Sequence, residues 1–283
     1  MSTFIKALFV LTWLVATSEQ APVHERIMNG HTIPNPSSYG GYGVHIITEE
    51  YTAKNGITYS PSACGGTLIS SRVIVSAQHC FVNPTTLIGA RKATFYIDTV
   101  SYRAEAGGKI VSCEDCWDNY PGYKGAINGS QNDLTVVTLP EPIDVKNIML
   151  PTLPPEDQTI KDYANKSVFI VGWGFDENGD QPQTLKGVYM LISSYQYCQI
   201  EKKNFPEHIC AKNINNNTVC SGDSGGGAVV DNQLIGIASF IYPPPENPKD
   251  VCFEVEYVAF ITPLDKNYRR FIETSLKKAE NNA

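Results

Sequence analysis

Short apolar runs recur along most of the chain, separated by clusters of glycine, proline, asparagine and aspartate. The runs are rich in β-branched residues and alternate in part between apolar and polar positions, which is typical of short β-strands. The predicted strands are Gly66–Ala77, Ala93–Ser101, Leu134–Leu139, Val168–Gly172, Gly187–Ile192 and Gln233–Phe240. Many short strands with turn signals between them predict an all-β sandwich or barrel.

The end of the chain has a different period. Apolar residues recur there every three or four positions, which predicts an amphipathic helix over about Pro263–Lys278. The apolar positions of this helix are Leu264, Tyr268, Phe271, Ile272 and Leu276. Pro243–Pro248 reads PPPENP, and we expect an exposed loop because proline suits neither strand nor helix.

Residues 1–18 have the pattern of a secretory signal peptide. Lys6 precedes the apolar run Ala7–Ala16, and the small residues Ala16 and Ser18 suit cleavage after Ser18. The run is short for a helix that spans a bilayer, although a membrane anchor is the alternative. We expect a secreted, extracellular protein that is not attached to a membrane.

Composition narrows the function classes. The chain has 283 residues, of which 42% are hydrophobic and 18% charged, an ordinary globular balance. Its net charge is -7 and no basic stripe is present, so the sequence argues against a nucleic-acid partner. Eight cysteines in a secreted chain predict disulfides. The CEDC spacing of Cys113 and Cys116 resembles a redox or metal motif, but without a second CxxC or a nearby histidine we favour a structural bridge.

Three stretches carry candidate chemistry. CSGDSGGG, Cys220–Gly227, sets Ser224 among four glycines, which suit a sharp turn or a close backbone approach, with a plain surface turn as the alternative. SAQHC places His79 after an apolar strand, and NDLTVV places Asp133 before one. Each alone has a structural explanation. Together, in a secreted chain rich in strands, they indicate an active site.

The chain resembles the chymotrypsin-like serine proteases from Ile27 to about Ser275. The resemblance rests on these three stretches and on RIMNG at Arg26–Gly30, CGGTLIS at Cys64–Ser70 and GWG at Gly172–Gly174. It implies that residues 27–283 form two packed antiparallel six-stranded β-barrels with the active site between them, followed by the C-terminal helix. No cofactor is expected. No metal is expected either, because the region that forms a calcium loop in some relatives has no clear acidic pair here and only Glu105 nearby.

The resemblance implies a role for each residue of the site. His79 would take the hydroxyl proton of Ser224, and Asp133 would orient the imidazole. The backbone N–H groups of Gly222 and Ser224 would form an oxyanion hole. Ser239 matches the family serine that lies beside the buried aspartate, and we also expect it among the substrate-binding residues.

Activation is implied by the same resemblance. Residues 19–26 would form a propeptide, and a trypsin-like protease would cut Arg26–Ile27. The new Ile27 amino terminus would pair with Asp223, since a lone buried carboxylate is costly. Met28 and Asn29 depart from the family's usual valine and glycine.

The resemblance also implies disulfide pairs. The expected bridges are Cys64–Cys80, Cys198–Cys210 and Cys220–Cys252, with Cys113 and Cys116 left as the remaining pair.

Protein or peptide substrates are expected, with a pocket for the side chain before the cut. Thr218, six residues before Ser224, would form its base, where trypsin-like members carry aspartate, so a trypsin-like preference is not expected. Ile241 and Val255 would narrow its walls and favour small or medium apolar residues, as in elastase-like members. The alternative is a preference for large apolar residues before the cut. The insertion FIYPPPENPKDVC would either restrict access at the rim or be neutral.

Two classes of function stay open. The first is an active endopeptidase, for which we expect a monomer with protein inhibitors as further candidate partners. The second is a non-catalytic protease homologue that binds a partner or regulates a cascade, in keeping with the unusual Met28, Asn29, Gln78 and Gly227. Sequons at Asn128, Asn165 and Asn216 are candidate glycosylation sites.

Overall fold

The computed structural model describes residues 30–49, 51–52, 58–59, 62–125, 131–176, 178–193, 198–200, 203–205, 208–214, 218–242, 257–261 and 266–281. The expected signal peptide, the propeptide and the Arg26–Ile27 bond lie outside these residues, as do Pro243–Pro248 and Val255.

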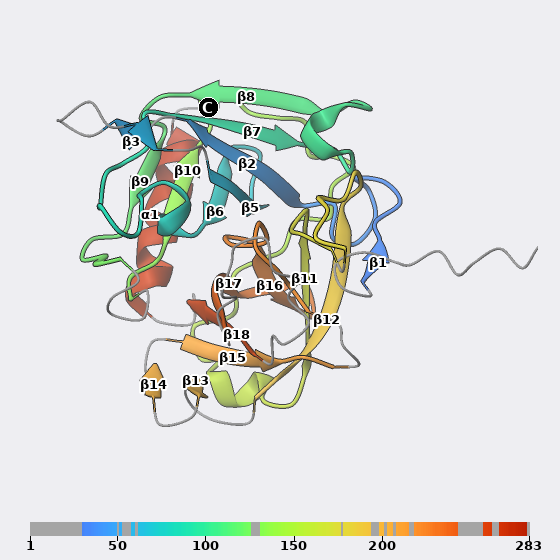
Figure 1. The fold of residues 1–283 in the computed structure, drawn as a ribbon, viewed down its shortest axis with the longest axis vertical. Coiled ribbons are helices and arrows are strands. Elements are labelled where there is room, and N and C mark those ends of the chain that lie inside the picture. The colour runs from blue at the N-terminus through green and yellow to red at the C-terminus, as the bar shows by residue number, and fades with distance from the viewer. Residues whose placement is uncertain are drawn as a thin grey trace, which may run out of the picture.

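Most strands belong to two antiparallel sheets, one formed by the first half of the chain and the other mainly by the second half (Figure 1). The first sheet has the order β8-β7-β2-β5-β6-β10-β9. Its strands are β2 (Gly43–Glu49), β5 (Ser62–Leu68), β6 (Val73–Ser76), β7 (Lys92–Ile97), β8 (Lys109–Cys113), β9 (Trp117–Asn119) and β10 (Thr135–Thr138). The outer strands β8 and β9 are consecutive in the chain and flank the Cys113–Cys116 turn. The two therefore act as one interrupted strand, and the chain itself closes this barrel.

The second sheet has the order β1-β12-β11-β16-β17-β18-β15. Its strands are β1 (His31–Thr32), β11 (Ser167–Gly172), β12 (Lys186–Ile192), β15 (His208–Lys212), β16 (Gly227–Val230), β17 (Gln233–Tyr242) and β18 (Tyr257–Ile261). A further pairing of β12 with β15 closes six of these strands into a ring, and β1 adds to its outside. The predicted all-β fold of two antiparallel barrels is confirmed.

The remaining elements are short, apart from one helix. They are the ladders β3 (Tyr51–Thr52) with β4 (Thr58–Tyr59) and β13 (Cys198–Ile200) with β14 (Lys203–Phe205), the 3-10 turns η1 (Gln78–Cys80), η2 (Tyr102–Ala104) and η4 (Ile160–Tyr163), and the helix α1 (Lys266–Asn281). The predicted C-terminal helix is confirmed. Within the described part of the chain, no helix is long and apolar enough to cross a membrane.

The helix α1 comes last in the sequence but packs on the first barrel, against β6 and β10 (Figure 1). Tyr268, Ile272 and Ala279 are buried in the apolar core that also holds Phe95 and Val136 of the first barrel. The C-terminal element therefore supports the half of the molecule made first.

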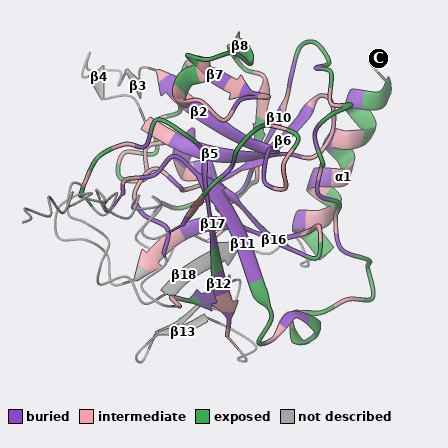
Figure 2. Ribbon diagram, turned by 90° about the vertical axis from the view of Figure 1, so that its right-hand side faces the viewer, coloured by how far each residue is buried: buried purple, intermediate pink, exposed green. Residues whose placement is uncertain are grey.

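Two apolar clusters hold the barrels. One fills the second barrel and includes Val168, Ile170 and Ile235. The other runs from the first barrel into the junction, where Trp173 and Leu185 join it. Figure 2 shows the buried strand residues gathered where the two sheets meet, while exposed residues recur along α1 between its buried ones. The junction is thus a packed, water-excluding base for side chains that meet there.

One predicted strand is corrected. Gly66–Ala77 is not a single strand, because the chain turns at Ser70 between β5 and β6. The Ser70 hydroxyl accepts the N–H groups of Arg72 at 3.2 Å and Val73 at 3.0 Å. A serine that bonds the backbone in this way replaces the ladder with a tight turn.

Candidate active site

His79 lies in η1, directly after the buried strand β6. The strand end is fixed by Ser76, whose hydroxyl donates to the Gly65 carbonyl at 2.8 Å. The far end of η1 is fixed by Thr48, whose hydroxyl donates to the Cys80 carbonyl at 3.0 Å. The imidazole therefore projects from a turn that is held on both sides.

Asp133 follows a residue in an unusual backbone conformation. Asn132 has a φ of 58°, in the left-handed region that asparagine tolerates better than most residues. Its side chain donates to the Gly122 carbonyl at 3.1 Å and accepts the hydroxyl of Tyr268 at 3.3 Å. This turn directs the Asp133 side chain into the junction, where it is fully buried.

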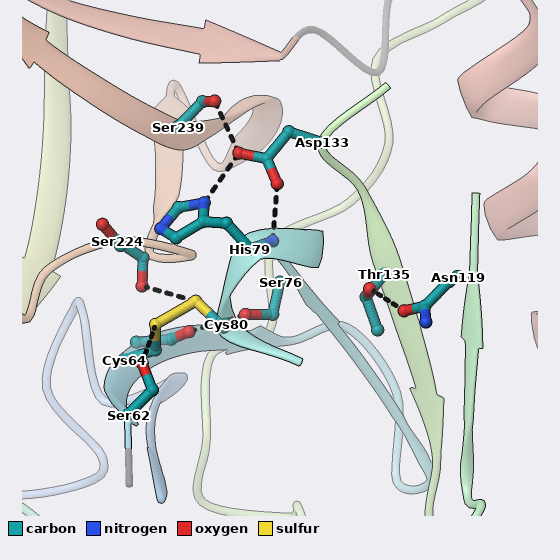
Figure 3. A network of polar contacts seen from close by, with 11 residues as sticks. Ser62, Cys64, Ser76, His79, Cys80, Asn119, Asp133, Thr135, Ser224 and Ser239 are labelled. Atoms are coloured by element: carbon teal, nitrogen blue, oxygen red, sulfur yellow. Dashed lines mark hydrogen bonds and ion pairs between the residues drawn. A yellow bond between two sulfur atoms is a disulfide. The ribbon is translucent and has the colours of Figure 1, made fainter. Parts of the chain in front are cut away.

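The structure brings His79 and Asp133 into direct contact (Figure 3). His79 Nδ1 lies 2.7 Å from Asp133 Oδ2, and the His79 backbone N–H donates to Asp133 Oδ1 at 2.8 Å. Ser239, on β17, donates its hydroxyl to Asp133 Oδ2 at 2.6 Å. Both carboxylate oxygens are thus satisfied, which makes this deep burial of a charge tolerable.

The pair shifts the pKa of each partner. Burial alone would lower the pKa of His79, but the charge and hydrogen bond of Asp133 raise it above the ordinary value. Burial alone would raise the pKa of Asp133, but the charge of His79 and the hydrogen bonds of His79 and Ser239 lower it. The arrangement favours an imidazole that binds a proton readily beside a carboxylate that keeps its charge.

Ser224 lies on the side of the imidazole that faces away from Asp133 (Figure 3). Its side chain is partly exposed, and its carbonyl accepts the N–H of Gly65 on β5 at 2.7 Å. Among the described residues no hydrogen bond joins the Ser224 hydroxyl to His79. The second barrel therefore presents the serine to a histidine–aspartate pair carried by the first.

The glycines around Ser224 have two structural tasks. Gly222 and Gly225 have positive φ angles of 100° and 84°, which turn the backbone on each side of Ser224. A Cβ at Gly225 would lie 2.3 Å from Ser76 Oγ, and one at Gly227 would lie 2.3 Å from Thr67 Oγ1. Since only glycine fits there, this turn approaches the first barrel closely enough to meet His79.

The backbone N–H groups of Gly222 and Ser224 are available. Neither donates a hydrogen bond within the described part of the chain, whereas the N–H of Asp223 between them donates to the Cys220 carbonyl at 3.1 Å. Two free donors on either side of a bonded one are suited to bind an oxygen of a ligand.

Asp223 is the second buried carboxylate of the site, with 1% of its surface exposed. It accepts the N–H of Gly174 at 2.7 Å and that of Cys220 at 2.9 Å. A Cβ at Gly172 or Gly174 would lie 2.0 Å or 2.3 Å from its oxygens, which explains both glycines of the GWG motif. No cation pairs with Asp223 among the described residues, and burial raises its pKa to about 6 despite the two hydrogen bonds.

The expected pocket residues are only partly placed. Thr218 is fully buried, and its hydroxyl donates to the Val219 carbonyl at 3.3 Å. Ile241 is partly buried and packs against the core of the second barrel. Ser239 is bonded to Asp133, and Val255 lies outside the described residues.

The cysteines near the site are joined to each other. Cys64 and Cys80 form a disulfide beside His79, and Cys113 and Cys116 form one between β8 and β9. Although Cys64, Cys80 and His79 lie within 4.8 Å, the two sulfurs are bonded and offer no thiolate to a metal. Cys210 and Cys220 are also in disulfides. Of their expected partners, Cys252 and the side chain of Cys198 are not among the parts of the chain that the structure describes.

Sequence reasoning missed two residues that hold the turn leading into Asp133. Asn132 could have been noticed, because asparagine before a strand favours a left-handed turn. Tyr268 gave no such signal, since it was expected only as an apolar position of the helix. Gln78 stood out as unusual, but its contacts could not be read from sequence.

Two closed antiparallel barrels, with a histidine–aspartate pair and a glycine-flanked serine at their junction, define the chymotrypsin-like class of protein folds. The sequence model of the trypsin family matches residues 40–261. The chain belongs to the trypsin family and is a serine protease of that family.

Known relatives agree with this placement. A trypsin of Phaedon cochleariae is 30% identical over 228 residues, which cover 75% of this chain and 81% of that protein. Serine protease SP24D of Anopheles gambiae is 28% identical over 211 residues, which cover 72% and 73%. The solved structure of HL collagenase superposes with a TM-score of 0.68 at 22% identity, over 89% of this chain and 99% of that one, a likeness of fold.

Proposed function

We propose that the chain is a secreted serine endopeptidase that hydrolyses peptide bonds through an acyl-enzyme on Ser224. One observation carries the proposal. The buried His79–Asp133 pair, with Nδ1 and Oδ2 2.7 Å apart, stands beside a partly exposed serine flanked by two free N–H groups. In a member of the trypsin family these groups suit the roles of base, orienting acid, nucleophile and oxyanion donors.

The chemistry follows from the positions of these groups. As Ser224 Oγ attacks the peptide carbonyl carbon, His79 Nε2 takes its proton, and the N–H groups of Gly222 and Ser224 stabilise the oxyanion by about 3 kcal/mol per donor. The C–N bond then breaks, and the amine leaves with the proton from His79. Water attacks the resulting ester, passing one proton to His79 and then to Ser224, which releases the acid.

We propose that the protein is made as a zymogen. Cleavage at Arg26–Ile27 by a trypsin-like protease would free the Ile27 ammonium, and Asp223 would be its partner. The support is the state of Asp223, a buried carboxylate whose pKa is raised to about 6 and which has no cation among the described residues. An ammonium group there would replace an unfavourable buried charge with an ion pair.

For the residue before the cut we propose a preference for small or medium apolar side chains. Thr218 carries no charge, and its hydroxyl is already engaged with the Val219 carbonyl, so a basic side chain would find no partner in it. The partly exposed Ile241 would take up space that a large ring needs.

The test begins with the secreted, uncut chain. Trypsin is used to cut it, amino-terminal sequencing checks for Ile27, and a fluorophosphonate probe titrates the serine, with Ser224→Ala as the matched control. We expect stoichiometric labelling of the cut chain and none of the control. A correct Ile27 terminus without labelling would overturn the proposal in favour of a non-catalytic homologue.

A peptide library that varies the residue before the cut tests the preference with the same sample. Cleavage after Ala, Val or Leu is the expected result. Cleavage after Phe or Tyr would keep the enzyme and reject the narrowing role of Ile241. Cleavage after Lys or Arg would reject the role of Thr218 as the pocket base.

A further inference from the structure

Gln78 is a buried polar residue beside the site that the reaction itself does not use. It is 7% exposed, and one end of its amide faces two backbone oxygens, those of Tyr120 and Asn132. Both oxygens only accept hydrogen bonds, so the amide nitrogen must face them. In that orientation it donates to the Tyr120 carbonyl at 2.8 Å and the Asn132 carbonyl at 3.1 Å.

These contacts link the segments that carry two site residues. Gln78 directly precedes His79 in η1, and Asn132 directly precedes Asp133. Tyr120 follows β9, and its N–H donates to the Leu134 carbonyl at 2.9 Å, directly after Asp133. One side chain thus bridges the histidine turn to the adjacent ends of the paired strands β9 and β10, next to the aspartate.

We propose that Gln78 is a positioning residue that sets the distance between His79 and Asp133, an inference that rests on the proposed function. It acts at the Asn132 carbonyl, which belongs to the peptide bond that leads into Asp133. The same carbonyl accepts the N–H of Leu134 at 2.9 Å, while Asn132 itself holds a φ of 58°. A donor from η1 at this carbonyl fixes the strained turn relative to the histidine.

The geometry that depends on this bridge is tight. The Asp133 carboxylate lies 2.7 Å from His79 Nδ1 through Oδ2, and its Oδ1 accepts the His79 backbone N–H at 2.8 Å. Both contacts join the two segments that Gln78 bridges. Without the bridge, a small shift between the segments lengthens both contacts, and a misplacement of about 1 Å can cost about 100-fold in rate.

This role differs from a contribution to folding alone. Gln78 is buried and faces the protein, so its loss leaves the substrate-binding surface unchanged. The expected effect is therefore on kcat and not on KM. A looser contact with Asp133 also removes part of what raises the pKa of His79, so the acid limb of the pH profile of kcat/KM moves to lower pH.

The experiment uses the cut, full-length enzyme and the variants Gln78→Met and Gln78→Ala. Methionine keeps the length of the side chain and removes the donors. Gln233→Met is the matched control, since Gln233 accepts the hydroxyl of Tyr163 at 2.6 Å in the second barrel. Each kcat is referred to sites titrated with fluorophosphonate, so that a variant that folds only in part is still measured correctly.

We expect kcat to fall about 10- to 100-fold in both Gln78 variants, with KM within about twofold and the acid limb at lower pH. The control should lower the melting temperature and leave kcat and the pH profile unchanged. Gln78 variants that match the control in kcat and pH profile would overturn the positioning role while the enzyme itself remains active. Failure of the unmodified enzyme to label would instead overturn the proposed function.

Discussion

The site contains two buried aspartates, and their surroundings differ. Asp133, from the first barrel, is 0% exposed, and its pKa is lowered because His79 and Ser239 bind its carboxylate. Asp223, from the second barrel, is 1% exposed, and its pKa is raised to about 6 because only two backbone N–H groups meet it. Burial is almost equal, so the sign of the shift is set by whether a cation-forming partner is present.

The difference suggests a division of labour between the barrels. The first barrel supplies its histidine–aspartate pair, and the bonds that hold the pair, including that of Ser239 from the second barrel, are present in the described structure. The second barrel holds the serine on a turn that includes an uncompensated carboxylate, a state that an incoming ammonium would relieve. In the proposed zymogen, activation therefore acts on the serine half of the site while the base half is already assembled.

Of the two aspartates, Asp133 should have the larger effect on catalysis when it is replaced. We expect Asp133→Asn to lower kcat of the cut enzyme by about 10^4-fold, because an asparagine amide holds His79 in the wrong tautomer. KM should change little. The measurement is kcat per titrated site, with Asp118→Asn as the control, since Asp118 is an exposed partner of Lys278 at 3.5 Å. A loss of less than tenfold would show that the pair is not the working base.

Replacing Asp223 should affect the serine half of the site, by lowering the fraction of active molecules after cleavage. Breaking a buried ion pair costs about 3–5 kcal/mol, which corresponds to about 100- to 4,000-fold fewer active molecules. We therefore expect Asp223→Asn to cut normally at Arg26–Ile27 but to lose about that much activity, seen as a small fraction of rapidly labelled sites. Full activity in Asp223→Asn would show that activation does not depend on an ion pair with Asp223.

The pH dependence of stability should also distinguish the halves. In the uncut chain the pKa of Asp223 is raised from 3.8 to about 6, so between these values the folded chain keeps a proton that the unfolded chain releases. The free energy of unfolding should fall by about 3 kcal/mol as pH rises through this window. Asp133, with its lowered pKa, acts in the opposite direction, stabilising above its ordinary pKa and losing this as pH falls.

The Asp223 contribution is isolated by comparison with Asp223→Asn. Urea unfolding of both uncut proteins at pH 4 to 7 should show that the unmodified chain loses about 3 kcal/mol relative to the variant. After cleavage the Ile27 ammonium should remove this loss. An identical pH dependence in the uncut protein and the variant would contradict the raised pKa of Asp223.

The sequence predicts the residues of the site better than it predicts the contacts that hold them. Motif residues such as His79, Asp133 and Ser224 could be named because each lies in a short stretch whose spacing is set by local turns. The strand over Gly66–Ala77 was wrong because its β-branched pattern continues through a serine turn that pattern alone does not reveal. The contacts of Gln78 and Tyr268 depend on segments far apart in the chain, and no local period encodes them.

The smallest expected effect concerns the support that α1 gives to the first barrel. Tyr268 donates its hydroxyl to Asn132 Oδ1 at 3.3 Å, and the Tyr163 hydroxyl, with one proton to donate, lies between Gln158 Oε1 and Gln233 Oε1, the latter 2.6 Å away. Tyr268→Phe and Tyr163→Phe should each lower stability by about 1 kcal/mol, the usual net value of one hydrogen bond.

Only Tyr268→Phe should also affect catalysis, because only Asn132 adjoins Asp133. We expect a fall in kcat of less than about tenfold, since Gln78 still holds the Asn132 carbonyl. Urea unfolding and kcat per titrated site measure the two effects separately. Equal kcat in the two variants would mean that α1 stabilises the first barrel without tuning its aspartate, and that Gln78 and Ser239 suffice to hold it.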